Sequence, residues 1–585
     1  MARYYDFAGQ KIIIPGSYTR RSFPADQSVG AATGIVVIMG EASKGGIPYN
    51  ASDDVEETIN VIEGQAQALN VFGGGDLYYG AEFYLTAHKD ERFNRASVAN
   101  CMVVNQMTQA TTKLQAGATD IIDVAFVKYG TDGNSAAVKV SSGGDGGKLI
   151  EMTYKGNTIL EEDVNLKMLS IRYTGSAATS TMTITATKLE TACAAVATDD
   201  LDITLADYTD LGSLINFIND QPNYTCKLTG SSDELPNVFD AISGVDIKTA
   251  TYEALATVEA LLRSLNSTGM VTATIATGAA RTIITDMSEY KYLTGGTVSA
   301  ATTADWIAAL EKLENYNLNN IVVMSGSATI QDLVQDHCAR MNAVKTKNYR
   351  QAGFGAGAVQ NTRALRVDQM KALNSAYIEY CVSKFTRYDH IQRTTREFEP
   401  YYLYPMIAGL RYPNSVGMDV VFKYVNVLST PEISKQDQEA YAAAGGTLIQ
   451  KTTNVSNSNL FEIKVNNTTF QGTQVTMSNP SVVYSVNILT KDFEERMIEK
   501  IRGLDTVANS VVMTTIQNWV LTDLFPKYRD DFKWITNGPD GQKAFSNVSF
   551  RQEGEVFYTD AILTMSVTPR FAFNFFTFIV PGQAV

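Results

Sequence analysis

The sequence has little charge for its length. Among its 585 residues, 48 are Lys or Arg and 62 are Asp or Glu, so 19% are charged and the net charge is −14. Soluble chains usually carry about 25% charged residues. The acidic balance argues against electrostatic binding of nucleic acid or of an anionic membrane. A long chain with so little charge is also typical of a protein that covers part of its surface in an assembly.

Long apolar runs are missing as well. A bilayer-spanning helix needs about 20 apolar residues in a row, and the longest run here, Phe571–Val580, is far shorter. The first residues, Met1–Asp6, lack the apolar core of a secretion signal. We therefore expect neither a membrane-spanning segment nor secretion.

Histidine is scarce, and the cysteines are scattered. None of His88, His337 and His390 stands at metal-binding spacing from another histidine or from a cysteine. His337 and Cys338 are neighbours on a predicted helix and so point in different directions. We therefore predict no metal site, no cofactor and no disulfide. The cysteines, which we expect to be reduced and mostly buried, are Cys101, Cys193, Cys226, Cys338 and Cys381.

Catalytic motifs are absent or incomplete. The glycine-rich segment Phe72–Asp76 lacks the Lys-Ser/Thr ending of a phosphate loop and is expected to be a turn between two helices. Gly353–Gly357 lacks the full spacing of a dinucleotide-binding turn. Ser325–Ser327 follows a predicted strand, but no His and Asp set accompanies it. We therefore predict that the protein is not an enzyme.

Two separated parts of the chain have the pattern of an α/β core. Gly34–Gly40 is a continuous apolar run that favours a strand buried on both faces. Apolar spacing predicts helices over Ser52–Leu69 and Leu77–Ala87. An α/β rhythm returns after Thr297, with a helix over Asp305–Asn315 that has Thr303 as its N-cap.

The second part continues with strands and helices in alternation. This order favours a largely parallel, doubly wound sheet. We expect strands at Ile321–Met324, 350–358, Tyr377–Val382 and Leu460–Val465, and helices at Ala328–Val344 and Val367–Leu373.

Residues 131–290 have a different composition, rich in Thr, Ser, Gly and Asp. Segments such as Thr181–Ala186 and Val271–Ile275 alternate between apolar and polar residues, which is typical of half-buried strands. We interpret this stretch as one or two β-rich domains inserted into the core. Helices are expected within it at Leu211–Ile218 and Tyr252–Leu265.

The charge is unevenly distributed. Residues 131–290 hold 10 basic and 21 acidic residues, a net −11, whereas residues 341–411 hold 11 basic and 5 acidic ones, a net +6. The basic stretch is either a set of solvated loops and helix faces or a surface that binds an acidic partner, including another copy of the chain. We predict that the acidic insertion lies on the exterior of an assembly.

The two ends resemble arms rather than domains. Ile12–Ile14 is a short β-branched run closed by Pro15-Gly16, and Phe571–Val580 is a second run after Pro569. Both are predicted strands without a local partner, and unpaired strand edges recruit other chains. Before the second arm, helices are expected at Asp492–Arg502 and 506–524 and a strand at Val556–Val567.

The order of these segments resembles that of contractile tail sheath proteins. Ile14–Thr19 is similar to the Pro-Gly-Val-Tyr-like arm of the family, and Gly34–Gly45 to its first core strand with a Gly-Glu-Ala ending and a Lys-Gly turn. Phe72–Leu77, Tyr129–Asn134 and Leu293–Thr297 resemble the family's segments that lead into and out of the inserted domains. Val548–Gly554, the strand that follows it, Pro569 and the last arm resemble the C-terminal domain.

The resemblance implies a fold and a division into domains. It implies a subtilisin-like α/β core without catalytic residues, inserted β-rich domains, a C-terminal α+β domain and strand arms at both ends. The expected parts are an N-terminal arm (1–30), the first part of the core (31–130), the insertion (131–290), the second part of the core (291–480), the C-terminal domain (481–569) and the C-terminal arm (570–585).

The resemblance also implies a function. Hexameric rings would stack helically around a tail tube and contract from a metastable state, driving the tube through a host envelope for genome ejection. Expected partners are further copies of the chain, the tail tube, the baseplate and the tail terminator, in a virion assembled in the host bacterial cytoplasm. The alternatives are the sheath of a phage-derived injection particle and another virion surface or capsid-type protein.

The predicted role of the arms is strand exchange between subunits. The residues expected to pair with neighbouring subunits are Ile12, Ile13, Ile14, Phe571, Phe573, Phe575, Phe578 and Val580. The residues expected to act as arm hinges are Pro15, Gly16 and Pro569.

Overall fold

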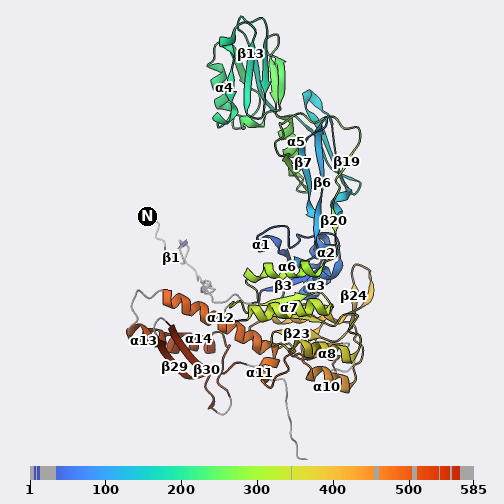
Figure 1. Cartoon of the computed structure of the whole chain (residues 1–585), viewed down its shortest axis with the longest axis vertical. Helices are drawn as coiled ribbons and strands as arrows, with labels where there is room; N and C mark the ends of the chain where they lie inside the picture. Colours follow the sequence, from blue (N-terminus) through green and yellow to red (C-terminus); the bar gives the residue numbers. More distant parts are fainter. Residues whose placement is uncertain are drawn as a thin grey trace, which may run out of the picture. The chain divides into compact units, whose positions relative to one another are not determined.

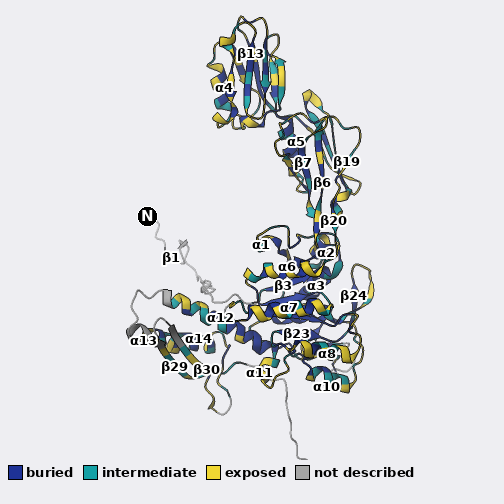
Figure 2. Ribbon diagram, in the orientation of Figure 1, coloured by how far each residue is buried: buried dark blue, intermediate teal, exposed yellow. Residues whose placement is uncertain are grey.

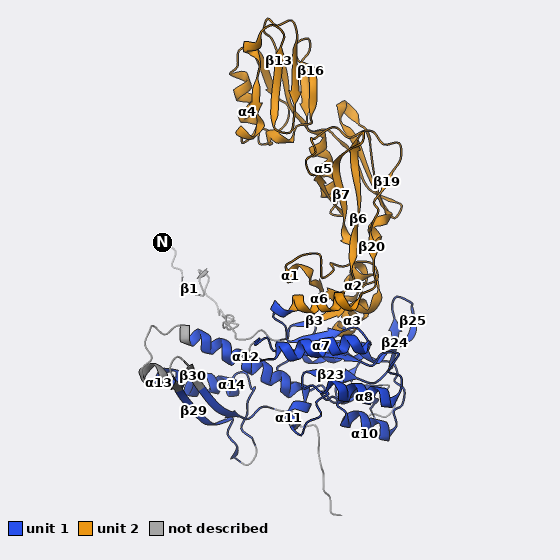
Figure 3. Cartoon of the chain, in the orientation of Figure 1, with its two compact units in different colours: residues 1–37, 86–96, 314–585 blue, residues 38–85, 97–313 orange. Residues whose placement is uncertain are grey.

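The structure, a computed structural model, describes residues 5–7, 10–12, 34–343, 346–452, 460–502, 510–538, 541–553 and 556–566 (Figure 1). The chain divides into two compact units (Figure 3). Unit 1 comprises residues 1–37, 86–96 and 314–585, and unit 2 comprises residues 38–85 and 97–313. Among the described residues, the helices are too short or too polar to cross a membrane.

A mainly parallel sheet forms the centre of unit 1. Parallel pairing places Asn320 opposite Gln351, Gly353 opposite Glu379, and Cys381 opposite Thr447. Every residue of β21, β22 and β23 is buried, as the continuous apolar runs predict (Figure 2). The strands are β21 (Asn320–Val323), β22 (Gln351–Gly355), β23 (Ile378–Cys381), β27 (Gly446–Lys451), β28 (Phe461–Val465, antiparallel to β27) and β26 (Tyr424–Val425).

Helices cover these strands. A side chain on Gly353 would meet the ring of Tyr404 at 2.0 Å, so glycine in β22 allows helix α9 to lie directly on the sheet. The glycines of 353–357 are therefore explained by packing. The covering elements are α7 (Ala328–Met341), α8 (Arg363–Leu373), the 3₁₀ turn η8 (Pro400–Leu403), α9 (Tyr404–Arg411) and α10 (Lys435–Ala443). Along the chain, an antiparallel hairpin of β24 (Phe385–Asp389) and β25 (Thr394–Phe398) follows β23 and precedes η8.

The last part of unit 1 is an α+β region. Tyr528 and Arg496 both donate hydrogen bonds of 2.7 Å to the buried carboxylate of Asp492. Directly before Pro526, which has no N–H, the helix widens into a π-helical segment, in which the Phe525 N–H reaches back to Val520 O. The elements are α11 (Val475–Ser478), α12 (Pro480–Arg502), α13 (Ser510–Trp519), the π segment η9 (Val520–Leu524), α14 (Phe525–Asp530), β29 (Phe545–Glu553) and β30 (Val556–Leu563).

Unit 2 begins with strands and helices of an α/β type. The predicted strand at residues 34–40 is confirmed as β3, with five buried residues. The helix predicted at 305–315 is also confirmed, but its N-cap is Thr302, whose hydroxyl accepts from Asp305 N at 3.3 Å. The elements are β3 (Val36–Gly40, whose first two residues are counted in unit 1), α1 (Val55–Thr58), β4 (Asn60–Ile62), α2 (Gln65–Phe72), α3 (Gly75–Leu85), β5 (Ala99–Val103) and α6 (Thr303–Lys312).

A first β-rich part of unit 2, which we call β region A, comprises residues 107–164 and 257–298. Its two sheets and one helix enclose a core that includes Ile122, Val138 and Leu261. Its elements are β6 (Met107–Ala116), β7 (Thr119–Tyr129), β8 (Ala136–Ser142), β9 (Lys148–Tyr154), β10 (Asn157–Val164), α5 (Thr257–Ser267), β18 (Val271–Ile275), β19 (Lys291–Tyr292) and β20 (Thr297–Val298).

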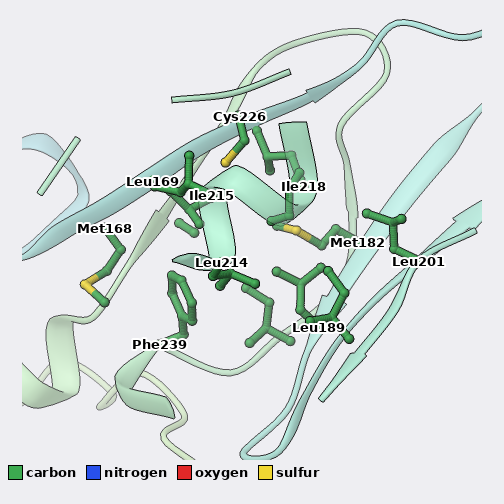
Figure 4. Close-up of a cluster of buried hydrophobic side chains, with 14 of the residues drawn as sticks. Met168, Leu169, Met182, Leu189, Leu201, Leu214, Ile215, Ile218, Cys226 and Phe239 are labelled. Atoms are coloured by element: carbon green, nitrogen blue, oxygen red, sulfur yellow. The ribbon is translucent and has the colours of Figure 1, made fainter. Parts of the chain in front are cut away.

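The second β-rich part, β region B, comprises residues 167–255 and is inserted in the sequence of β region A. Its core is separate: Leu214 and Ile218 of the helix face Met182 and Leu189 of the strands (Figure 4). Its elements are β11 (Lys167–Tyr173), β12 (Ser180–Ile184), β13 (Lys188–Cys193), β14 (Asp202–Thr204), α4 (Leu211–Asn219), β15 (Tyr224–Leu228), β16 (Ile242–Asp246) and β17 (Tyr252–Leu255).

The structure differs from the sequence-based expectations in further places, among them the start of α12, which is Pro480 and not Asp492. The helix predicted at Ser52–Leu69 is wrong, because β4 separates α1 from α2. The Asn60 side chain pairs with both Ile47 N (2.8 Å) and Ile47 O (2.9 Å), which holds this segment extended. The helix predicted at Tyr252–Leu265 begins only at Thr257, after β17. The β-rich part starts with β6 at Met107, earlier than the expected residue 131, because β6 pairs with β7.

Candidate functional site

Four segments that carry the sequence resemblance meet in unit 2. They are Glu41–Lys44, Phe72–Asp76, Tyr129–Asn134 and Leu293–Thr297, and we call this set the glycine junction. Up to about 250 residues separate them in the chain, yet each contacts at least one of the others. The junction lies where the α/β part of unit 2 continues into β region A (Figure 1).

The first half of the junction is a turn held by the end of a strand. As predicted, Phe72–Asp76 turns the chain between two helices, α2 and α3. Gly73 has a φ of 69° and ends α2 in the left-handed region, where glycine is favoured. The backbone N–H groups of Ser43 and Lys44 both donate to Phe72 O at 3.1 Å. The glycines of this loop are therefore occupied in packing against the segment after β3.

The second half joins this turn to β region A. At Gly130, which has a φ of 91°, a β-carbon would lie 2.0 Å from Lys44 O, so only glycine fits. A β-carbon on Gly296 would lie 2.4 Å from Gly130 O. The Asn134 amide accepts from Gly296 N at 3.0 Å and donates to Gly296 O at 2.8 Å. The chain entering β region A is thereby fastened to the chain leaving it.

An ion cluster covers one side of the junction. The carboxylate of Asp132 lies 3.1 Å from Lys155 Nζ and 3.6 Å from Lys44 Nζ, and it accepts a 3.2 Å hydrogen bond from Tyr154. Burial alone would raise the pKa of Asp132, but the two lysines hold it below its ordinary value. The cluster therefore stays ionised at neutral pH and links Lys44 to β region A. The junction offers close packing and charge pairing, which position its segments.

The predicted arm residues lie almost entirely beyond the described part of the chain. Ile12 is described, as the last residue of β2 (Gln10–Ile12), which pairs antiparallel with β1 (Tyr5–Phe7). The prediction that this run has no local partner is therefore wrong for Ile12, which lies opposite Tyr5. The arm and hinge residues outside the described ranges are Ile13, Ile14, Pro15, Gly16, Pro569, Phe571, Phe573, Phe575, Phe578 and Val580.

The histidines and cysteines show ordinary structural environments. His337 Nε2 lies 3.2 Å from Arg350 Nη1, and burial, with the positive charge of Arg350, lowers the pKa of His337 to about 3. The ring is therefore neutral at neutral pH and can accept from the guanidinium. The five cysteines are free and buried. Within the described ranges, no group of three His, Cys, Asp or Glu side chains has the geometry to hold a metal.

Sequence reasoning missed a buried polar network in unit 1. Glu379 of β23 and Arg411 at the end of α9 form an ion pair in which both side chains are fully buried, and Arg411 Nη2 lies 3.0 Å from Glu379 Oε2. Asn466 donates to Glu379 Oε2 at 2.7 Å and accepts from Arg411. Tyr404 donates to Glu379 Oε1 at 3.1 Å, and Asn320 donates to Tyr404 at 2.8 Å. The sequence signal that could have revealed this network is the presence of charged or amide residues inside otherwise apolar strand segments.

Sheath proteins are among the solved structures that are similar to this chain. A sheath tail protein from Desulfitobacterium hafniense is 13% identical over 94% of this chain and 100% of that chain, with a TM-score of 0.48. One from Listeria innocua is 13% identical over 92% of this chain and 96% of that chain, with a TM-score of 0.49. The contracted helical sheath of the anti-feeding prophage is 11% identical over 49% of this chain and 77% of that chain, with a TM-score of 0.35. No protein-family model and no curated protein sequence matches the chain.

Proposed function

We propose that this chain is the structural subunit of a contractile tail sheath, which forms hexameric rings stacked helically around a tail tube. The observation that carries this proposal is the glycine junction. Four segments selected only for their resemblance to sheath proteins converge on one set of backbone contacts, centred on Gly130, Lys44 and Gly296. Chance similarities spread over the chain would have no reason to meet in this way.

The C-terminal α+β region supports assembly through strand addition. Among the described residues its sheet has two strands, β29 and β30, so both are edge strands. A two-stranded sheet is only marginally stable alone and gains from further strands. We infer that the arms 1–30 and 570–585 of neighbouring copies supply them, with Pro15, Gly16 and Pro569 as hinges.

Contraction then needs no bound nucleotide. The arms keep neighbouring copies linked by main-chain hydrogen bonds while the globular cores move into a lower-energy packing. The energy is stored in a metastable extended state, which a kinetic barrier protects until triggering. The tail tube, the baseplate and the tail terminator are the proposed partners, and the virion tail is the proposed location.

Microscopy of the purified chain tests this function. We expect striated tubes in negative stain from the full chain, and none after deletion of residues 2–20 or of residues 570–585. A Val359→Ser chain is the matched control, because Val359 is 81% exposed in a loop of unit 1 and its replacement should leave tubes unchanged. Tubes from either truncated chain would contradict strand exchange, and a monomeric full chain under all conditions would contradict the sheath function.

A further inference from the structure

An aromatic pocket with a basic rim lies in unit 1. It has a volume of about 380 Å³ and is formed by two separate segments of the unit, residues 88–95 and 410–424. The His88 ring lies between Phe93, at 5.0 Å, and Tyr424, at 6.2 Å. Phe93 and Phe422 are 55% and 49% exposed, so the pocket presents aromatic surface to solvent.

Three cationic side chains lie at this pocket or beside one of its rings. Arg95 and Lys423 line it, and Lys464 Nζ lies 5.6 Å from the centre of the Phe422 ring. Within the described part of the chain, none of the three has a carboxylate at ion-pair distance. Uncompensated cations beside exposed aromatic rings favour a ligand that combines aromatic groups with carboxylates.

The backbone at the pocket is strained. Phe422 has a φ of 66°, in the left-handed region that residues with a β-carbon rarely adopt. Its N–H donates to Ile463 O at 2.8 Å, and Ile463 N donates to Lys423 O at 3.0 Å. These bonds keep Phe422 and Lys423 in place with the ring toward solvent. Such strain is common at binding sites, where it pre-organises a side chain.

A surface of the complementary kind occurs in β region B. Phe217 of α4 is 38% exposed, and its ring lies 5.5 Å from that of Tyr208. Asp207, next to Tyr208 in the sequence, and Asp220, three residues after Phe217, are both exposed. We call these four residues the acidic aromatic patch. It combines the two kinds of group that the pocket selects.

We propose that the pocket of one copy of the chain binds the acidic aromatic patch of a second copy. Aromatic rings of the patch would pack on Phe93 and Phe422, while Asp207 and Asp220 approach Arg95 and Lys423. The contact joins two different surfaces of the same chain, and such head-to-tail contacts produce rings or helical polymers. The inference therefore rests on the self-assembly in the proposed function and adds a contact that is independent of the arms.

Charge reversal tests the contact in the full chain. We expect Arg95→Glu/Lys423→Glu, or Asp207→Lys/Asp220→Lys, to weaken self-association at least about ten-fold in sedimentation velocity, since like charges then face each other. A chain with all four substitutions should regain most of the association. The controls, Lys371→Glu/Lys451→Glu and Asp53→Lys/Asp233→Lys, change the net charge equally at exposed positions elsewhere and should have no effect.

Cross-linking tests the geometry directly. The five native cysteines are buried, so thiols introduced at exposed positions dominate oxidation. A mixture of Phe422→Cys and Phe217→Cys chains should form a disulfide-linked dimer containing one chain of each kind. Loss of association without rescue in the four-fold variant, unchanged association in both reversed variants, or absence of the mixed dimer would overturn the proposal. Tubes that form from both reversed variants as readily as from the parent chain, at the same protein concentration, would overturn it as well, while leaving the sheath function intact.

Discussion

At the scale of single residues, the most consequential interaction is the ion pair between Glu379 and Arg411. Both side chains are fully buried, and Asn466 and Tyr404 complete the hydrogen bonding of the carboxylate. Burial alone would lower the pKa of Arg411, but Glu379 raises it above its ordinary value. The guanidinium therefore remains charged inside unit 1, and its stability depends on its partner.

Glu379→Gln should destabilise unit 1 strongly, because it leaves Arg411 buried beside a neutral amide. Breaking a buried pair in this way costs about 3–5 kcal/mol. Urea denaturation followed by circular dichroism measures the loss. The double variant Glu379→Gln/Arg411→Met, which removes both charges, should recover most of it. A Glu379→Gln chain as stable as the parent chain would contradict a stabilising role of this ion pair.

A second residue-scale prediction concerns Gly130. Gly130→Ala combines a backbone conformation that is essentially restricted to glycine (φ 91°, ψ −166°) with a β-carbon 2.0 Å from Lys44 O, so we expect a loss of stability above the roughly 1 kcal/mol that a left-handed φ costs alone. Gly117→Ala is the matched control, since Gly117 has a φ of 62° but no atom within 4 Å of the added carbon. Thermal denaturation of the two variants compares Gly130 with a glycine that has a positive φ but no close neighbour, and equal losses would show that the junction tolerates the β-carbon.

At the scale of elements, local pattern predicted many helices and strands well. Helices α4 and α7 and strands β12, β18 and β23 lie within about two or three residues of their predicted ends, as expected for strongly periodic segments. The failures occur where a long-range contact decides. The Asn60 side chain forms hydrogen bonds with the backbone of Ile47, so part of the predicted helix forms β4 instead. The local sequence pattern does not indicate this contact.

The N-terminus of α5 leads to an element-scale prediction. Asp240 of β region B accepts from Thr257 N at 2.7 Å and Val258 N at 2.9 Å. Asp240→Asn should weaken this cap by about 1 kcal/mol. Burial raises the pKa of Asp240, so the folded chain holds its proton more tightly than the unfolded one. The stability that this proton contributes is present at acid pH and is lost as the pH rises through the raised pKa.

The cost of Asp240→Asn should accordingly be larger near pH 4 than at pH 7, because the asparagine variant has no such pH dependence. Denaturation of both chains across this range provides the measurement. Asp233→Asn is the control, since Asp233 is exposed and caps no helix. A cost that grows toward neutral pH would reverse the sign and contradict the role of burial.

At the scale of the whole molecule, the nested cores of unit 2 make a deletion possible. The core of β region B is built from residues between Met168 and Ala256, and that of β region A uses none of them. Ala256 N donates to Leu166 O at 2.8 Å, so the two ends of the excised segment are adjacent.

Replacing residues 167–255 by a short Gly-Ser linker should therefore leave the remainder folded. The expected penalty is about 1 kcal/mol from loss of the Asp240 cap on α5, with losses of about 1 kcal/mol or less each from the Arg263–Glu234 ion pair and the hydrogen bond from Ala241 N to Arg281 O. Circular dichroism and limited proteolysis of the deleted chain check this outcome. Excision of residues 107–164 alone is the contrasting control, because it removes more than half of the β region A core and should prevent folding of that part.

The sequence by itself determined the local elements, the contrast between the acidic β-rich insertion and the rest, and the order of segments that resembles a sheath protein. These features depend on composition, period and spacing, which are properties of the chain. Only the tertiary structure decided that β regions A and B have separate cores, that Gly130 and Gly296 close a junction onto Lys44, and that Glu379 meets Arg411. Such contacts join residues tens to hundreds of positions apart, and their energy comes from close packing and paired charge, which exist only once the chain has folded.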